Sequence, residues 1–181
     1  MAVTIWQGLL IIWTACALTW WLIATGLVLG TRRQPDKQRP VSDHTSITVF
    51  KALAGPLTVS EFVHLSRCIE TFVADLDQHS ELIIGCHEHD QARCRQFIES
   101  MRQRYPGAHL KMVADPDPKR LAANPKISWM QILAPHASGS LWFWSDADIE
   151  APAGTLHSLR ADFSSGSVQM ITSPYTIANV P

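Results

Sequence analysis

The sequence predicts an α/β domain with a mostly parallel sheet, preceded by a transmembrane helix, and three observations lead to this fold class. Short apolar runs alternate with segments of helical periodicity from residue 46 onward, as they do in parallel α/β proteins. Residues 5–29 carry no charged side chain, and this span exceeds the roughly 20 residues that cross a bilayer core. An aromatic run at residues 141–144 stops abruptly at two aspartates, which is typical of a buried strand that reaches the edge of a sheet.

The apolar segment is interpreted as a membrane anchor. A cleaved signal peptide is the alternative, but no basic region precedes the segment, and its apolar core is longer than the roughly 7–15 residues usual in a signal peptide. The positive-inside rule places the rest of the chain in the cytoplasm, because basic residues follow the segment and none precedes it; in a bacterium the membrane would be the inner one. These basic residues are Arg32, Arg33, Lys37 and Arg39.

The expected organisation is an anchor at residues 1–30, a charged, proline-containing linker at residues 31–45 and one domain at residues 46–181. A chain of 181 residues has room for one domain and an appendage. The net charge of −1 argues against a nucleic-acid partner, which favours a basic surface. The four cysteines form no C-x-x-C pair and are expected to be free thiols in a reducing cytoplasm.

In the first half of the domain, a strand is expected at residues 46–50, and a Gly-Pro turn then leads into a helix. Thr58 and Glu61 have the spacing of a capping box at the start of this helix. Its apolar face consists of Phe62, Leu65, Ile69, Phe72, Val73 and Leu76. A second strand is expected at residues 81–86, and a second helix at residues 91–105 ends at the next Pro-Gly pair.

In the second half, a strand at residues 109–114 is followed by a loop with two Asp-Pro pairs. Asn124 and Pro125 are a typical helix start, with an N-cap and a proline at the first helical position. Pro135 ends this short helix. The aromatic strand beginning at Leu141 follows, then a helix at residues 152–163 and a fifth strand at residues 168–172.

The acidic pair Asp146 and Asp148 is the strongest candidate site. In parallel sheets, ligands bind beyond the carboxyl ends of the strands, where this pair is expected to lie. Because side chains alternate along an extended chain, both aspartates point one way and Ala147 the other. Two carboxylates on one side of a turn suit Mg²⁺ or Mn²⁺ that bridges a protein and a diphosphate. A helix cap or an Asx-turn without a ligand is the alternative.

Four motifs occur in order along the domain. They are Lys51-Ala52-Leu53-Ala54-Gly55, the acidic cluster at residues 86–90, Asn124-Pro125-Lys126-Ile127 and Ser145-Asp146-Ala147-Asp148-Ile149. This order resembles processive-type family-two glycosyltransferases of the GT-A fold, most of all the ceramide glucosyltransferase branch and the bacterial hopanoid-biosynthesis glycosyltransferases. The resemblance covers roughly residues 47–175. It implies transfer of a sugar from a nucleotide-sugar donor, a UDP-sugar, to a lipid acceptor such as ceramide or a hopanoid.

The resemblance also implies roles for individual residues. A divalent ion held by Asp148, with Asp146 nearby, would stabilise the departing diphosphate. Lys51 lies in a loop that is implied to contact the nucleotide. An acid in the cluster after the second strand is implied to contact the nucleotide base, and the residues leave open whether this is Glu88 or Asp90.

Two of these candidates have simpler explanations. Lys126 can add positive charge to the donor phosphates, since it lies in the first turn of a helix whose N-terminal end favours anions. It is equally a solvated helix lysine. Glu88 can accept hydrogen bonds from a uracil or ribose, or it only solubilises a turn.

Other ligands and reactions were weighed as well. The cluster at residues 86–90, with Cys94 beyond it, suggests zinc, but consecutive residues across a strand end diverge rather than converge tetrahedrally. The eight histidines are scattered, and none is interpreted as a base. A phosphoryl-transfer enzyme that uses the two aspartates as nucleophile and acid usually has a glycine and a threonine or valine next, whereas this sequence has Ile149 and Glu150.

The resembled family has a third aspartate that deprotonates the acceptor hydroxyl, followed by a Gln/Arg-x-x-Arg-Trp motif and further membrane helices. All of these are expected beyond Pro181, so that residues 46–181 would be the donor-binding part of a GT-A domain with an incomplete sheet. The catalytic base therefore stays unassigned. A non-catalytic, membrane-tethered nucleotide-sugar-binding module or an inactive fragment is the alternative function.

Overall fold

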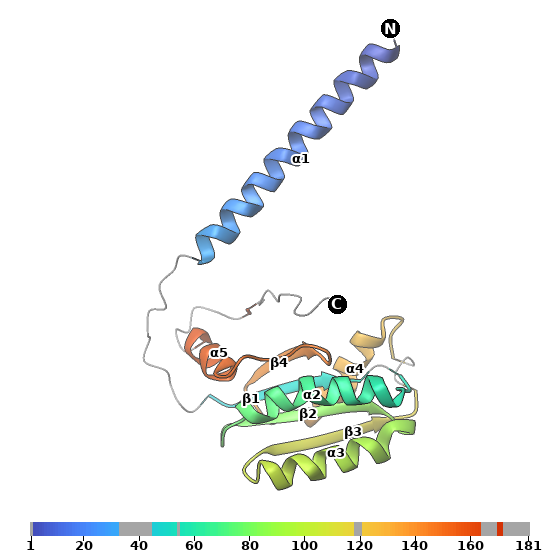
Figure 1. Ribbon diagram of the computed structural model, residues 1–181, viewed down its shortest axis with the longest axis vertical. Coiled ribbons are helices and arrows are strands. Elements are labelled where there is room, and N and C mark those ends of the chain that lie inside the picture. Colours follow the sequence, from blue (N-terminus) through green and yellow to red (C-terminus); the bar gives the residue numbers. More distant parts are fainter. Residues whose placement is uncertain (1, 33–44, 54, 118–120, 164–169, 172–181) are drawn as a thin grey trace. The chain divides into compact units, whose positions relative to one another are not determined.

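The computed structural model describes residues 2–32, 45–53, 55–117, 121–163 and 170–171 (Figure 1). The chain separates into two compact units, Met1–Gln38 and Arg39–Pro181. Most of the linker expected at residues 31–45 lies outside the described residues. The two units are therefore described one at a time.

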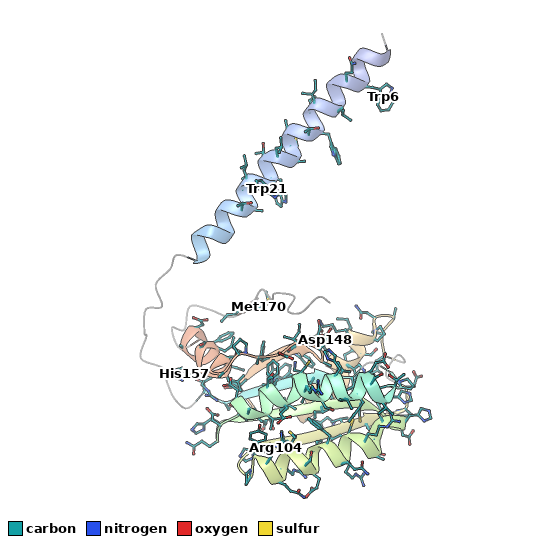
Figure 2. All side chains as sticks on the ribbon, viewed as in Figure 1. Trp6, Trp21, Arg104, Asp148, His157 and Met170 are labelled. Carbon is teal, nitrogen blue, oxygen red and sulfur yellow. The ribbon has the colours of Figure 1, made fainter. Side chains whose placement is uncertain are left out.

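The first unit contains a single described helix, α1 (Ala2–Arg32), of 31 residues. Its segment Trp6–Gly26 has a mean hydropathy of 1.7 and is long and apolar enough to cross a membrane. The side chains of Trp6 and Trp21 extend outward from the helix and are exposed (Figure 2). One N-terminal apolar helix of bilayer length is therefore present, and a signal sequence would share this length and composition.

The second unit is built on a four-stranded, all-parallel sheet in the order β3-β2-β1-β4. The strands are β1 (Ile47–Ala52), β2 (Ser80–His87), β3 (His109–Asp115) and β4 (Leu141–Asp146). This arrangement confirms the predicted α/β class with a parallel sheet. The fifth strand predicted at residues 168–172 lies outside the described residues, apart from Met170 and Ile171, which are not in a strand.

Helices cover both faces of this sheet (Figure 1). They are α2 (Val59–Asp75), η1 (Glu88–Asp90), α3 (Gln91–Arg104), α4 (Pro125–Leu133), η3 (Ala134–His136) and α5 (Thr155–Phe163). Three of them, α2, α3 and α5, bury side chains such as Phe72, Ile98 and Leu156 against one face. On the opposite face, Trp129 of α4 packs against Phe50. Because side chains alternate along a strand, neighbouring residues of β1 face different helices.

Two helices begin at the caps that the sequence predicted. The hydroxyl of Thr58 accepts a hydrogen bond from the backbone N–H of Glu61 (3.3 Å), and the Glu61 carboxylate accepts one from the backbone N–H of Thr58 (2.8 Å). These two bonds form the capping box. At the start of α4, Asn124 Oδ1 accepts a hydrogen bond from the backbone N–H of Lys126 (2.9 Å).

The helix α5 begins at Thr155, three residues later than predicted. Gly154 has a φ of 84°, which a right-handed helix does not accommodate. The carboxylate of Asp75, at the end of α2, accepts hydrogen bonds from the backbone N–H groups of Gly154 (2.6 Å) and Leu156 (2.8 Å). A distant helix therefore supplies the cap of α5, which the local sequence does not reveal.

A buried carboxylate, Glu81, ties the start of β2 to the loop before β4. Its Oε1 atom accepts hydrogen bonds from Thr48 Oγ1 (2.6 Å) and from the backbone N–H of Ser138 (2.6 Å). Its Oε2 atom lies 2.7 Å from Lys111 Nζ. Gly139 follows in the same loop, where an added Cβ would lie 2.5 Å from the backbone nitrogen of Thr48. This close approach sets the path into β4, and hence the place where β4 ends.

Candidate functional site

The carboxyl ends of the four parallel strands lie at one edge of the sheet, and the site residues predicted from the sequence are carried by elements that meet there. Lys51 lies one residue before the end of β1, and Glu88 directly follows β2. Asp146 is the last residue of β4, and Lys126 lies in the first turn of α4. Loops at this edge of a parallel sheet are where ligands bind in open α/β proteins.

The two aspartates flank a tight turn. The backbone carbonyl of Asp146 accepts a hydrogen bond from the N–H of Ile149 (3.3 Å). Between the aspartates, Ala147 is buried, whereas Asp146 and Asp148 are both exposed. The turn therefore presents two carboxylates to solvent just beyond the end of β4.

Lys126 reaches the first of these carboxylates. Its Nζ atom lies 2.6 Å from Asp146 Oδ1, and more than half of each side chain is exposed. Asp148 forms no hydrogen bond or ion pair with the part of the chain that the structure describes. The carboxylate of Asp146 and the ammonium group of Lys126 thus come together from β4 and α4, which are separated in sequence by a loop and a 3₁₀ turn, and Asp148 lies two residues after Asp146.

Lys51 is placed differently from the other candidates, because its side chain is completely buried. Its ammonium group donates hydrogen bonds to Ser145 Oγ (2.9 Å) and to the backbone carbonyls of Asp146 (2.7 Å) and Ile149 (2.9 Å). Burial lowers the pKa of Lys51 to about 7; the nearby Cys68 thiol and the carboxylates of Asp148 and Asp146 act in the opposite direction. The structure thus places Lys51 behind the turn rather than on the surface beside it.

The structure separates Glu88 from Asp90, between which the sequence left the choice open. Asp90 is buried, and its Oδ2 atom accepts a hydrogen bond from the backbone N–H of Leu57 (3.0 Å). The guanidinium of Arg93 donates a hydrogen bond to the backbone carbonyl of Leu57 (2.9 Å) and lies 3.5 Å from Asp90 Oδ1. The carboxylate of Asp90 therefore fixes the loop that follows β1. Glu88 is exposed in η1.

Comparison with known proteins decides the family. The protein-family model described as "Glycosyl transferase family 21" matches residues 9–180 of the sequence. The chain belongs to this family. The sequence resemblance to the ceramide glucosyltransferase branch is thereby confirmed. No curated protein is similar enough to count as a relative.

Solved structures are similar to this family 21 chain in fold. The mannosyltransferase PcManGT from Pyrobaculum calidifontis, in complex with GDP-Man and Mn²⁺, matches with a TM-score of 0.53 and 17% sequence identity. The match covers 83% of this chain and 43% of that one. S. aureus TarS 1-349 matches with a TM-score of 0.48 and 12% identity, over 72% of this chain and 38% of that one. The GT-A-like fold is confirmed, and the chain spans less than half the length of either structure.

The two carboxylates at the end of β4 fit a divalent cation that is shared with another ligand. Asp146 and Asp148 supply two carboxylates, whose hard oxygens Mg²⁺ and Mn²⁺ prefer. Within the described ranges, no group of three or more His, Cys, Asp or Glu side chains is placed to hold a metal ion. A cation on this turn would take its other ligands from water and from a bound phosphate, as Mg²⁺ commonly does.

The cluster at residues 86–90 is not arranged as the zinc site considered from the sequence. The rings of His87 and His89 are stacked, with centroids 4.9 Å apart. His87 Nδ1 accepts a hydrogen bond from the backbone N–H of His89 (3.3 Å), so this nitrogen is already engaged. Cys86 and Cys94 are buried away from the surface. These side chains do not converge on a common point, as tetrahedral zinc requires.

Sequence reasoning missed Ser145 and Asp115 at this edge of the family 21 domain. Ser145 accepts one of the hydrogen bonds from Lys51. Asp115 ends β3 opposite His87 of β2, is buried, and accepts a hydrogen bond from the backbone N–H of Asp117 (2.9 Å). An acid at the end of a strand was the available signal for Asp115, as it was for Asp146, but the following prolines suggested only a loop.

Proposed function

We propose that this chain binds a nucleotide-sugar donor, a UDP-sugar, at the carboxyl edge of its sheet, as part of a membrane-anchored glycosyltransferase that acts on a lipid hydroxyl. One observation carries the proposal: the turn after β4 presents Asp146 and Asp148 together, and Lys126 lies 2.6 Å from Asp146. Family membership supports the same reaction class.

The proposal assigns the divalent cation, Mg²⁺ or Mn²⁺, to Asp148 and Asp146. Bound there, it supplies Lewis-acid stabilisation of the negative charge on the departing diphosphate. PcManGT, which has a similar fold, was solved with GDP-Man and Mn²⁺. The exposed carboxylates face solvent and need no rearrangement of the core to accept a cation.

Lys126 and Glu88 complete the proposed donor site. Lys126 contributes a point charge to the phosphates, and its backbone lies in the first turn of α4, where the helix dipole favours anions. Glu88 is exposed at the end of β2 and accepts hydrogen bonds from the nucleotide base or ribose. Lys51 and Asp90, whose polar groups are engaged inside the protein, support the site from behind.

The apolar helix α1 supports a lipid acceptor. As an anchor, it would hold the site close to the bilayer, with the domain in the cytoplasm. Ceramide and hopanoids are the acceptor classes that the resemblance suggests, and both present a hydroxyl group at the membrane surface. Transfer to each can be compared directly in membranes that contain the protein.

Donor binding is tested by calorimetry of the full chain in detergent with UDP-glucose, with and without Mn²⁺. We expect affinity that depends on Mn²⁺, and the Asp148→Asn variant is expected to weaken it at least about tenfold, because one of two protein ligands loses its charge. Glu99→Gln makes the matching change of an exposed acid on α3 and should leave binding unchanged. The proposal would be contradicted if wild type and Asp148→Asn bound UDP-glucose equally well in the presence of Mn²⁺. It would also be contradicted if Mn²⁺ did not change the affinity of wild type for UDP-glucose.

Removal of Lys126 is expected to change metal and nucleotide affinity in opposite directions. In Lys126→Met, Mn²⁺ alone should bind up to about fivefold more tightly, because Asp146 no longer has a competing cation and exposed ion pairs contribute up to about 1 kcal/mol. UDP in the presence of Mn²⁺ should bind more weakly, since one phosphate contact is lost. Arg95→Met, which removes an exposed cation on α3, is the control. Weaker binding of Mn²⁺ to Lys126→Met would contradict this prediction.

A further inference from the structure

Lys51 is a buried lysine whose contacts all lead to the turn that presents the two aspartates. It is paired with Ser145 in the register of β1 and β4, and it reaches past this partner to the turn itself. Its three hydrogen bonds go to Ser145 Oγ and to the backbone carbonyls of Asp146 and Ile149, at distances of 2.7–2.9 Å. A protonated lysine has three N–H donors, and this geometry uses all of them.

Lys51 also packs against apolar side chains of the core. Its Nζ atom lies 3.8 Å from the centre of the Phe72 ring of α2. Val49 of the same strand and Leu53, which directly follows that strand, belong to the core on that face of the sheet. An aliphatic side chain would fill this space without the cost of burying a charge. The ammonium group adds the bonds to the turn, and those bonds are what distinguish Lys51 from a core residue.

The turn has other contacts, but the hydrogen bond that joins its two ends is long. The Asp146 carbonyl accepts the N–H of Ile149 at 3.3 Å, which is a long hydrogen bond. Lys126 contacts only the carboxylate of Asp146, and the Ser145 hydroxyl donates to the Asp146 carbonyl at 3.3 Å without a bond to Ile149. Lys51 is bonded to the carbonyls of the first and last residues of the turn, and so holds the backbone that carries both carboxylates.

We propose that Lys51 is a positioning residue for divalent-cation binding: through the backbone of residues 146–149 it keeps the carboxylates of Asp146 and Asp148 at the spacing that one cation requires. It touches neither the cation nor the donor. This inference rests on the proposed function of the site. Without the ammonium group, the two like-charged side chains are free to separate, and cation sites tolerate little misplacement of their ligands.

The two lysines allow a test in which the side-chain change is the same but the contact with the turn is not. Lys51→Met and Lys126→Met each remove a lysine next to Asp146, and loss of positive charge there by itself raises affinity for a cation. Binding of Mn²⁺ alone to the full chain in detergent is measured from the electron paramagnetic resonance signal of free Mn²⁺. We expect Lys51→Met to bind Mn²⁺ roughly tenfold more weakly, as is typical when a group that orients a metal ligand is lost, whereas Lys126→Met binds it more tightly. If both variants bind Mn²⁺ more tightly than wild type, or if Lys51→Met binds it equally well, the positioning role is wrong.

Near-ultraviolet circular dichroism reports whether Lys51→Met is folded. If it is not, Ser145→Ala decides, because it removes one anchor of Lys51 and leaves the charge in place. A loss of Mn²⁺ affinity in folded Ser145→Ala supports the proposal, and unchanged affinity overturns it. Two outcomes separate the proposed function from the role of Lys51. If Asp148→Asn binds Mn²⁺ as tightly as wild type, the proposed function itself is wrong. If Asp148→Asn loses Mn²⁺ affinity but Lys51→Met keeps it, only the role of Lys51 is wrong.

Discussion

Replacing Gly85 with alanine is expected to lower the free energy of unfolding by about 2–3 kcal/mol, as overpacking of a rigid core does. Gly85 lies within β2, and an added Cβ would be 2.7 Å and 2.8 Å from Cε3 and Cζ3 of the Trp129 indole and 3.1 Å from Leu133 Cδ1. Both neighbours belong to α4 and are buried against the sheet, so neither can move aside easily. The measurement is urea unfolding of the full chain in detergent, followed by near-ultraviolet circular dichroism.

The contact between β2 and α4 also matters for the site, because α4 carries Lys126. Trp129→Leu should be destabilising by itself through the cavity it leaves. The double variant Gly85→Ala/Trp129→Leu should cost less than the sum of the two changes, since the new methyl group then no longer meets the indole ring. Gly107→Ala is the control, because no atom lies within 4 Å of a Cβ added there. Wild-type stability in Gly85→Ala would show that α4 is not packed on β2 as described.

Replacing Glu81 with glutamine is expected to lower the free energy of unfolding by about 3 kcal/mol at pH 7 and by progressively less in acid. Burial alone would raise the pKa of Glu81, but hydrogen bonds from Lys111, Thr48 and Ser138 bring it to about 2, below its ordinary value of 4.5. The unfolded chain therefore takes up a proton first. The stabilisation is fully present above pH 4.5 and is lost as the pH falls toward 2, and each pKa unit corresponds to about 1.4 kcal/mol.

Urea unfolding of wild type and Glu81→Gln at several values between pH 7 and pH 3 gives this dependence. The difference between the two proteins should shrink as the pH falls. Glu99→Gln, the same chemical change on the exposed surface of α3, should stay within about 0.5 kcal/mol of wild type throughout. A difference between wild type and Glu81→Gln that is constant with pH would contradict the assigned ionisation. Because Ser138 leads into β4, loss of this contact is also expected to loosen the approach to the aspartate turn.

The strands, helices and caps of the domain were predictable because they depend on neighbours in sequence. The capping box at Thr58 and Glu61 and the asparagine cap of α4 use residues within three positions of each other. The aspartate pair was recognisable because an apolar strand ended at two acids. The predicted start of α5 was too early, because its cap comes from Asp75, some eighty residues before it.

The role of Lys51 could not be predicted while the first strand was expected to end at Phe50. In the structure β1 continues to Ala52, and alternation then places Lys51 on the same face as Val49, inside the core. The burial of Asp90 likewise depends on a loop more than thirty residues earlier, whose Leu57 it holds. Neither contact leaves a local signature in the sequence.

The sequence by itself therefore established the α/β class, the apolar N-terminal helix and the acids at the end of a strand. Hydrophobic periodicity, helix caps and strand ends each depend on residues that are close together in the sequence. Tertiary structure decided which charges meet: Lys126 with Asp146, Lys51 with the turn, and Glu81 with the loop before β4. These contacts join segments up to about a hundred residues apart. They exist only once strand order, register and helix packing have brought those segments together, which is why the sequence pattern pointed to the site but not to the way it is held.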